Sequence, residues 1–451
     1  MRTKFTNHQN KKTRLRQAIA LVIALLLACT MTVHGADRYA VANGNWNATS
    51  TWSATSGGPS GASVPVAGDN VFIGEGATAR TVTVTATAAC ANITIGKASG
   101  ITGVLTLSVS GGTTLTVSGN ITINTTGSFT VTNVSIDNQH TLNIGGNLTV
   151  DGLFNVTTAN DDAASVVFNG LGAQTISGSG ATCTFFALTI NNPVGVTLQR
   201  DIVIAQTPSS TSANLTLGTN AIFDLSTFKA NRSTSGGTLT LNAGSRLKLS
   251  GSSGGQAGSN FPTNLTPSLN ATSTVEYAGA GQTVYNISYP GNLVLSGSGL
   301  KTFSAATTIG GNLSISNSVQ ASLAGSTLSS ASSLTLNNGG TPSGTWGSSG
   351  STATYQNDTY FGATSGRITV GSNTCSSIAF TTNKSDLKCF QDPSGGSISV
   401  SNVTGGTSPY MYSIHNGGAT YQPGNSFGSL PVGSYQVRIK DANQCETKPV
   451  Q

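Results

Sequence analysis

The sequence predicts an all-β protein: a right-handed parallel β-helix, or solenoid, followed by one immunoglobulin-like β-sandwich module. Short segments in which apolar residues alternate with Thr, Ser or Asn recur from about residue 71 to residue 370. Such alternation places the apolar side chains on one face of a strand. Gly, Asn and Ser separate the segments at short intervals, as turns require. No window of a dozen residues shows the periodicity of an amphipathic helix.

Residues 1–35 have the composition of a secretory signal peptide. Basic residues without any acidic residue occupy the first 17 positions, and an apolar run covers residues 18–28. This run is too short to cross a bilayer, and small residues precede Ala36, as signal peptidase requires. Leu26-Leu27-Ala28-Cys29 is close to a lipobox, so a lipoprotein signal is the alternative. We expect a secreted, extracellular protein at the cell surface, associated with the outer membrane and without an integral membrane span in the mature chain.

The charge balance argues against nucleic acid as a partner. The whole chain has 21 Lys and Arg against 15 Asp and Glu, a net charge of +6. The six basic residues of the signal segment account for this excess, so the chain from residue 36 onward is formally neutral. No basic stripe remains to neutralise phosphates, and we expect no nucleic-acid binding.

Residues 36–95 are predicted to form the N-terminal cap of the solenoid. They contain Trp46 and Trp52, followed by Pro65-Val-Ala-Gly-Asp-Asn-Val-Phe-Ile73. A solenoid needs a distinct first coil to cover its open end. The segment resembles the Trp-rich, P-x-x-GD-x-V-x-I entry that precedes β-solenoid segments in many secreted bacterial surface proteins. The two Trp rings could also stack on sugars, although packing within a cap explains them equally well.

Residues 96–371 are predicted to form the solenoid. A Gly-Asn-apolar-x-apolar unit recurs with steps of 27 and 20 residues, at Gly119–Ile123, Gly146–Val150, Gly291–Leu295 and Gly311–Ile315. A longer unit around Gln174 returns around Gln282, 108 residues later. These periods favour stacked coils, in which turn Asn residues could form ladders. The alternative is a string of β-sandwiches, for which strands of three to five residues are short.

Residues 372–451 are predicted to form a separate module. Four motifs follow one another, at Cys389, Gly405-Gly-Thr-Ser-Pro-Tyr-Met-Tyr412, Phe427-Gly-Ser-Leu-Pro-Val-Gly-Ser-Tyr-Gln-Val437 and Asp441-Ala-Asn-Gln-Cys445. Over residues 389–445 they resemble the SprB repeat, an immunoglobulin-like module of giant adhesins from gliding bacteria. Gln444 departs from the usual Gly and could alter the final turn. The resemblance implies gliding or surface attachment through a dedicated outer-membrane secretion route. Because the sequence ends shortly after one module, we expect a fragment of a large adhesin.

The cysteines are too few and too widely spaced for a disulfide scaffold. Cys90 and Cys183 lie in strand-like stretches, and we expect them to be small buried residues rather than nucleophiles. Cys389 and Cys445 bracket the last module and could close a disulfide in an oxidising compartment. Cys375 could pair with Cys389 instead, and the sequence leaves both pairings open.

The sequence offers no site for catalysis. Carbohydrate-active β-helices need carboxylates that converge on one face. Asp161-Asp162 is the one acidic cluster of the mature sequence, and its flanks indicate a solvated loop. His140 and His415 lack a second ligand type at useful spacing, and we expect both at the surface. Arg438-Ile439-Lys440 resembles a tripeptide of pectin hydrolases but lies in a predicted strand of the last module. We therefore expect no catalytic, cofactor-binding or metal-binding residue.

Thr-x-Thr runs such as Thr81/Thr83/Thr85 and Thr238/Thr240 predict rows of hydroxyl groups that face water. We expect a secreted or cell-surface structural and adhesive protein, not an enzyme and without cofactors. Its partners would be surface polysaccharides or other adhesive substrata. The alternatives are a carbohydrate-active β-helix enzyme of the lyase or hydrolase type and a glycan- or ice-binding protein.

Overall fold

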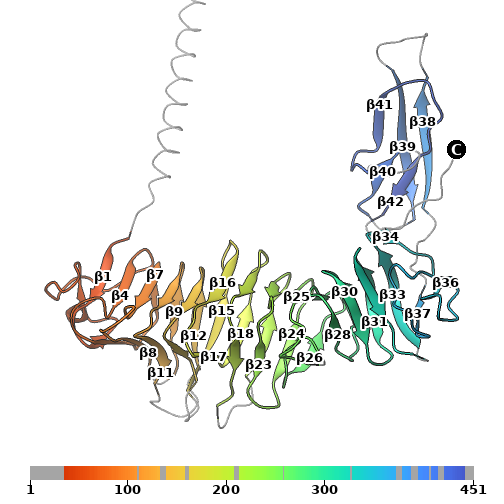
Figure 1. The fold of residues 1–451 in the computed structure, drawn as a ribbon. Coiled ribbons are helices and arrows are strands. Elements are labelled where there is room, and N and C mark those ends of the chain that lie inside the picture. The colour runs from red at the N-terminus through yellow and green to blue at the C-terminus, as the bar shows by residue number, and fades with distance from the viewer. Residues whose placement is uncertain are drawn as a thin grey trace, which may run out of the picture.

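The computed structural model describes residues 35–108, 111–132, 139–157, 162–207, 213–256, 258–325, 328–371, 378–386, 395–405, 408–414 and 421–441. Over these residues the chain is almost entirely β-strand and winds into a stack of coils (Figure 1). The predicted all-β class and the β-solenoid are confirmed, and the string of β-sandwiches is not found. The predicted signal peptide lies outside the described residues except for Gly35.

Three long sheets form the sides of the solenoid. Sheet A contains β1 (Asp37–Ala40), β3 (Trp52–Ser53), β4 (Asn70–Ile73), β7 (Asn92–Ile95), β10 (Ile121–Ile123), β13 (Leu148–Val150), β16 (Gln174–Ser177), β19 (Val196–Leu198), β22 (Ile222–Asp224), β25 (Arg246–Leu249), β27 (Thr274–Tyr277), β29 (Asn292–Leu295), β31 (Thr308–Ile315), β33 (Leu328–Leu336), β34 (Gly339–Gly340), β35 (Gly344–Gly347), β36 (Tyr355–Gln356) and β37 (Arg367–Val370). Sheet B contains β2 (Gly44–Asn45), β5 (Arg80–Val84), β8 (Gly103–Leu107), β11 (Gly127–Val131), β14 (Leu153–Asn155), β17 (Thr182–Phe185), β20 (Ile202–Ile204) and β23 (Ala230–Arg232). Sheet C contains β6 (Ala88–Cys90), β9 (Thr114–Val117), β12 (Gln139–Ile144), β15 (Ala163–Phe168), β18 (Ala187–Ile190), β21 (Leu215–Leu217), β24 (Thr238–Leu241) and β26 (Thr266–Leu269).

Successive coils stack in parallel register. Ile121 on β10 pairs with Leu148 on β13, so the step of 27 residues is one three-sided coil. Leu293 pairs with Leu313, so the step of 20 residues is also one coil. The shorter coils occur after sheets B and C have ended, where a short sheet of β28 (Gln282–Val284), β30 (Gly299–Phe303) and β32 (Val319–Ser322) accompanies sheet A.

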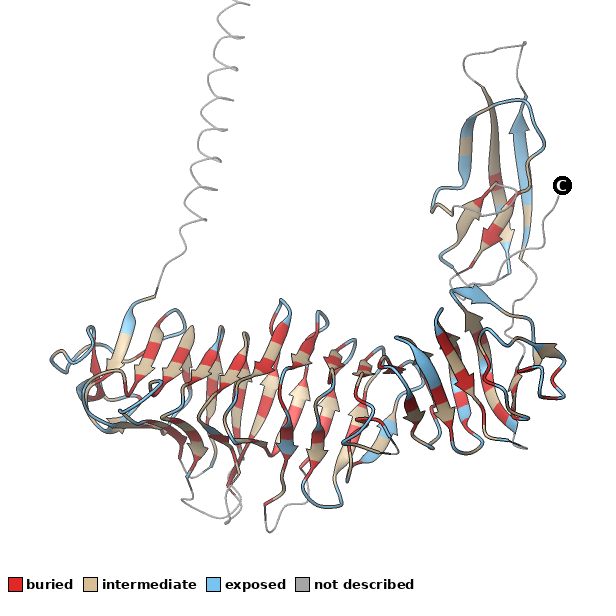
Figure 2. Ribbon diagram, viewed as in Figure 1, coloured by how far each residue is buried: buried red, intermediate tan, exposed pale blue. Residues whose placement is uncertain are grey.

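The core is a set of apolar columns that run along the stack. In sheet A, Val71, Ile93, Ile121, Leu148 and Ile176 follow one another in register and are almost fully buried. Figure 2 shows buried positions alternating with half-exposed ones along the strands. Each buried Val, Leu or Ile stabilises the fold by about 1.5–3 kcal/mol relative to exposure. Because the coils repeat, the apolar alternation predicted from the sequence builds one continuous core.

Contacts between neighbouring coils explain the Gly-Asn unit. The backbone N–H of Asn120 donates to Oδ1 of Asn92 at 2.8 Å, and that of Asn147 donates to Oδ1 of Asn120 at 2.8 Å. A Cβ atom on Gly119 or Gly146 would collide with the preceding coil. The Gly therefore permits close approach and the Asn satisfies the next backbone donor. The predicted Asn ladder is confirmed.

The 108-residue repeat marks two buried glutamines that each tie three coils together. Oε1 of Gln282 accepts the Gly279 N–H at 2.8 Å, and its Nε2 donates to the carbonyls of Leu249 and Gly251 in the preceding coil. From the following coil, Nζ of Lys301 donates to Oε1 of Gln282 at 2.9 Å. We call each such arrangement a glutamine bracket.

The first glutamine bracket uses an amide where the second uses an ammonium group. Nε2 of Gln174 donates to the carbonyls of Ile144 and Gly146, and Nδ2 of Asn192 donates to Oε1 of Gln174 at 2.9 Å. In the second bracket, Lys301 is fully buried and also donates to the Gly279 and Ala280 carbonyls. Burial lowers the pKa of Lys301 to about 8, and the negative charge of Glu276 opposes this shift. The following coil therefore supplies a donor in both brackets.

The N-terminal end is closed by antiparallel pairing of β1 with β3, next to the 3₁₀ turn η1 (Thr49–Thr51). Trp46 and Trp52 are buried and meet edge to face, with ring centroids 5.3 Å apart. Asp69 accepts the backbone N–H groups of Ala36 and Val66. However, β4, β5 and β6 already pair in register with the next coil. The regular coils thus begin at β4, inside the 36–95 segment that we assigned to the cap.

The other end of the solenoid also closes with antiparallel strands. β35 pairs antiparallel with β37, and β34 pairs antiparallel with β33. Trp346 stacks on Tyr355 with ring centroids 4.7 Å apart. This closure lies within the predicted 96–371 solenoid and was not anticipated as a separate cap.

After the solenoid, a three-stranded antiparallel sheet contains β38 (Ala379–Ser385), β39 (Gly396–Thr404) and β41 (Ser426–Leu430). A second, two-stranded sheet pairs β40 (Met411–Ser413) with β42 (Arg438–Lys440). Val400, Val437 and Ile439 form a small buried cluster with residues of both sheets. This sandwich-like region agrees with the predicted module. Cys375, Cys389 and Cys445 lie outside the described residues.

Candidate binding surface

The outward face of sheet C is built from uncharged polar side chains. Because side chains alternate along a strand, residues between the buried positions of β9 to β26 point away from the core. These residues, which we call the hydroxyl face, are Thr114, Thr116, Thr141, Asn143, Ser165, Val167, Ala187, Thr189, Asn214, Thr216, Thr238, Thr240, Thr266 and Ser268. All are half-buried or exposed, and all but Val167 and Ala187 carry a hydroxyl or an amide.

The parallel register aligns these side chains into rows along the stack. Thr189, Thr216 and Thr240 are register partners on neighbouring strands, and Ser268 continues the row. At about 4.8 Å per strand, the hydroxyl face extends on the order of 30 Å from β9 to β26. Each Thr hydroxyl can donate one hydrogen bond and accept two. The predicted outward rows are confirmed for Thr238 and Thr240.

Thr81, Thr83 and Thr85 form a comparable outward run on sheet B. All three are half-buried, whereas Val82 and Val84 between them are fully buried. Sheet B, however, also directs aliphatic residues outward, and Leu153 is 36% and Val203 is 40% exposed. Sheet C therefore offers the more uniformly polar of these two surfaces.

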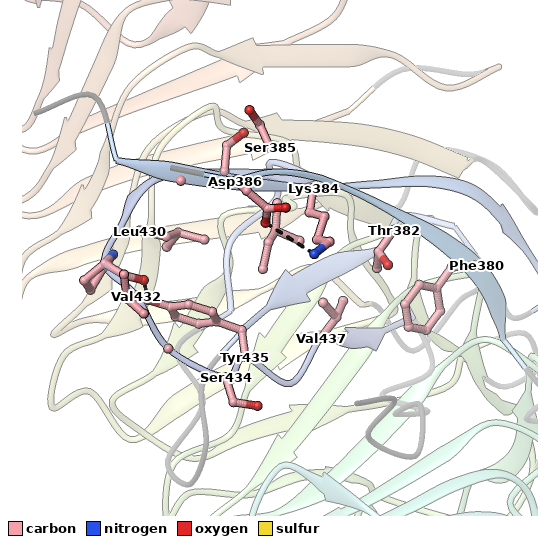
Figure 3. A pocket seen from close by; sticks show the side chains of 15 residues that line it. Phe380, Thr382, Lys384, Ser385, Asp386, Leu430, Val432, Ser434, Tyr435 and Val437 are labelled. Atoms are coloured by element: carbon pink, nitrogen blue, oxygen red, sulfur yellow. Dashed lines mark hydrogen bonds and ion pairs between the residues drawn. The ribbon is translucent and has the colours of Figure 1, made fainter. Parts of the chain in front are cut away.

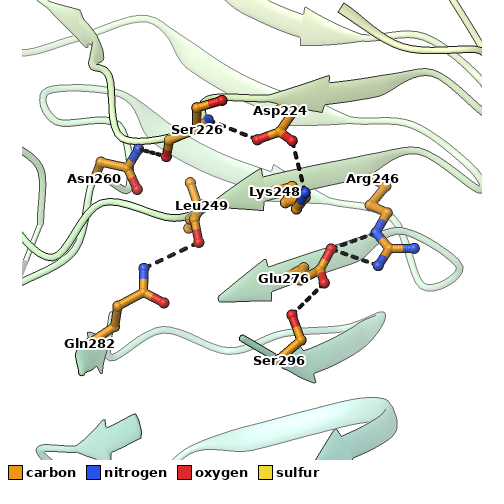
Figure 4. A network of polar contacts seen from close by, with 9 residues as sticks. All are labelled: Asp224, Ser226, Arg246, Lys248, Leu249, Asn260, Glu276, Gln282 and Ser296. Atoms are coloured by element: carbon orange, nitrogen blue, oxygen red, sulfur yellow. Dashed lines mark hydrogen bonds and ion pairs between the residues drawn. The ribbon is translucent and has the colours of Figure 1, made fainter. Parts of the chain in front are cut away.

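Sheet A carries charged residues where sheet C carries threonines. Asp224, Lys248 and Glu276 are register partners on β22, β25 and β27. Lys248 Nζ lies 2.9 Å from Asp224 Oδ2, and Arg246 contacts Glu276 through Nη2 at 2.6 Å (Figure 4). These charges pair with one another, so this part of sheet A is a structural ion-pair network.

The carboxylates of the described residues are spread over separate coils. Asp151 accepts hydrogen bonds from the backbone N–H and the hydroxyl of Ser179, which lower the pKa of Asp151. Asp201 accepts the backbone N–H of Lys229 at 3.0 Å. Within the described residues, no group of three or more His, Cys, Asp or Glu side chains could hold a metal ion. The carboxylates instead join one coil to the next.

Two of the sequence-based expectations are wrong. Asp161 lies outside the described residues, but Asp162 is fully buried rather than solvated. It directly precedes β15, where Ala163 and Ala164 are also fully buried at the corner between sheets B and C. His140 is fully buried rather than at the surface, because it shares the inward direction of Leu142 on β12. His415 lies outside the described residues.

The contacts of His140 favour a neutral ring. Its Nδ1 accepts the Thr113 N–H at 3.2 Å, and its Nε2 is buried without a hydrogen-bond partner. Burial lowers the pKa of His140, while the negative charge of Asp162 opposes this shift. Protonation at Nδ1 would also replace the acceptor of the Thr113 N–H with a second donor. The imidazole is therefore part of the core at this corner.

The other singled-out residues have structural positions. Cys90 and Cys183 are buried, as predicted, and burial raises the pKa of both thiols, that of Cys183 to about 12. Such thiols are poor nucleophiles at neutral pH. Trp46 and Trp52 are 4% and 0% exposed, so packing within the cap accounts for them and their faces are closed to sugars. The tripeptide Arg438–Lys440 forms β42, as predicted.

Buried basic side chains were not recognised from the sequence. Nε of Arg232 donates to the Ala213 carbonyl and its Nη2 to Oε1 of Gln206. Arg200 donates to the carbonyls of Val150 and Gly180 in preceding coils. Like Lys301, these cations occupy carbonyl groups at turns. Their partners lie about 20 to 50 positions earlier in the sequence, so no local pattern marks them.

A cleft of about 740 Å³ lies in the C-terminal region. Phe380, Ile398 and Val437 contribute apolar lining, and Lys384 and Asp386 form an ion pair at 3.3 Å (Figure 3). Both charged side chains are mostly exposed, so their pairing adds little stability. The cleft is lined from both the three-stranded sheet and the segment before β42, and thus opens into the small core of the module.

No family model, curated protein or solved structure matches this chain. In the part of the chain that the structure describes, no helix is long and apolar enough to cross a membrane.

Proposed function

We propose that this chain is a secreted structural and adhesive protein of the bacterial cell surface that catalyses no reaction. The observation that carries the proposal is the hydroxyl face. It is an extended surface of aligned hydroxyl and amide groups on a rigid stack of coils. Many weak polar contacts, repeated along such a rod, can add up to firm attachment through multivalency.

The construction of the rod supports a mechanical role. Antiparallel strands and buried Trp residues close both ends. The two glutamine brackets and the Asn ladder tie neighbouring coils through buried or half-buried hydrogen bonds. Closed ends protect the sheets from edge-to-edge association, which an exposed extracellular rod must avoid.

The distribution of charged groups favours adhesion over catalysis. The paired carboxylates Asp151, Asp201, Asp224 and Glu276 each join one coil to another. A polysaccharide lyase or hydrolase would need two or more carboxylates around one substrate bond. The signal-like segment and the SprB resemblance motivate placing the protein at the cell surface, with a role in attachment or gliding.

The proposal is tested with the mature protein immobilised on beads. We expect the beads to attach to bacterial surface material or purified polysaccharides, with no new reducing ends or unsaturated products after prolonged incubation. Release of oligosaccharides would show a carbohydrate-active enzyme instead. Failure to attach to any surface would contradict the adhesive function.

A further inference from the structure

We propose that the hydroxyl face of sheet C binds a neutral polysaccharide chain that lies along the axis of the solenoid. This inference rests on the proposed adhesive function and adds the surface and the chemical class of its ligand. Rows such as Thr189, Thr216 and Thr240 run along the axis, with one side chain per coil. An extended chain laid on such a row meets a polar group at every coil.

The side-chain inventory of the hydroxyl face selects the ligand class. The face has no Lys, Arg, Asp or Glu among its members, so a polyanion or polycation would lose solvation without gaining an opposite charge. It also lacks the Trp, Tyr and Arg anchors that dominate binding energy at protein interfaces. Hydroxyls and amides, which both donate and accept, suit the hydroxyl groups of an uncharged sugar polymer.

The same inventory separates a polysaccharide from ice. A regular ice surface would favour a uniform, flat array, but Val167 and Ala187 interrupt the rows and Asn143 and Asn214 mix amides among the hydroxyls. Thr266 and Ser268 on β26 are also more exposed than the members on the preceding strands. An irregular but uncharged polar strip fits a flexible polymer better than a crystal lattice.

Sheet B provides a matched control surface. Thr130 on β11 and Thr184 on β17 face outward and are half-buried, as Thr216 and Thr240 are on sheet C. The four positions lie on equally short strands in the three-sided part of the solenoid. A substitution made at both pairs therefore has the same local context but a different surface.

The test measures binding of the mature protein to microcrystalline cellulose, chitin and mannan, with alginate as a polyanion. We expect binding to at least one neutral polymer and not to alginate. We also expect this binding to persist in 1 M NaCl, a test condition at which exposed charges are screened over about 3 Å. The T216E/T240E variant should bind about tenfold more weakly or worse, because an unpaired charge at the interface opposes binding. T130E/T184E should bind like wild type.

A second variant guards against a folding defect. T216V/T240V keeps the branched shape and removes only the hydroxyl groups, so it should fold normally and still bind more weakly. Equal binding by the sheet B and sheet C variants would overturn the assignment of the surface while leaving adhesion intact. Attachment to cells without binding to any neutral polymer would overturn the ligand class. Thermal hysteresis lost in T216V/T240V would assign the face to ice instead.

Discussion

The solenoid and the C-terminal sandwich are both built from short, polar-rich strands, yet they bury very different cores. In the solenoid, apolar columns run from coil to coil and include fully buried residues in all three long sheets. In the described part of the sandwich, the buried cluster contains Val400, Val437 and Ile439. β38 is exposed along most of its length. Repetition, rather than strand length, therefore supplies the stability of this chain.

The difference predicts separate unfolding of the two regions. Leu188→Ala removes a fully buried side chain in sheet C and should lower the free energy of unfolding of the solenoid by about 2–5 kcal/mol. Val400→Ala should destabilise the sandwich alone. All three Trp residues of the chain lie in the end regions of the solenoid. Denaturation followed by Trp fluorescence should thus shift for Leu188→Ala and not for Val400→Ala. Equal shifts would contradict independent regions.

The glutamine bracket predicts a loss of intermediate size. Lys301→Met leaves Oε1 of Gln282 and the carbonyls of Gly279 and Ala280 without a buried donor, at about 1–3 kcal/mol for each group left unsatisfied. The matched control is Lys229→Met, because Lys229 is partly exposed and lies 3.9 Å from Asp201. That change should cost less than about 1 kcal/mol. Chemical denaturation measures both, and equal effects would argue against the bracket.

His140 predicts a pH dependence within the solenoid. Because its pKa is lowered in the folded protein, the unfolded chain takes up a proton first as the pH falls below about 6.5. Stability should therefore decrease from pH 6.5 down to the folded pKa and stay constant below it. Asp162 and Thr113 are the groups that face the ring. In His140→Leu the fall in melting temperature between pH 7 and pH 5 should be smaller. An unchanged fall would show that His140 does not contribute.

The outward threonines should matter least for stability. Thr216 and Thr240 contribute half-buried side chains to the hydroxyl face, and Val has the same branched shape and an equal preference for strands. T216V/T240V should change the free energy of unfolding by less than about 0.5 kcal/mol, as surface substitutions do. Thermal denaturation checks this value. A large loss would mean that these hydroxyls hold the fold rather than face a ligand.

Much of the solenoid could be predicted because its rules are local. Alternating Val, Ile and Leu define the buried face, and a Gly followed by Asn marks each point where the coil approaches its neighbour. His140 and Asp162 were misjudged because their burial depends on where a corner ends and a strand begins. The glutamine bracket was missed for a related reason, since the partners of Gln282 lie one coil away in either direction.

The candidate surface was predicted only in part. The sequence showed Thr-x-Thr runs, but whether separate runs share one sheet depends on the length of every intervening coil. Only the register joins Thr189, Thr216 and Thr240 into one row. The closure of the second end by Trp346 and antiparallel strands gave no repeat to recognise.

Hydrogen–deuterium exchange of the intact protein tests the central claim most directly, namely that a continuous stack of coils forms a rigid platform for an uncharged surface. Backbone amides that bond one coil to the next should exchange slowly throughout β4 to β33 and at similar rates in neighbouring coils. Amides of β38 to β42 should exchange much faster. Rapid exchange in the middle of the solenoid, or equal protection of both regions, would contradict this account.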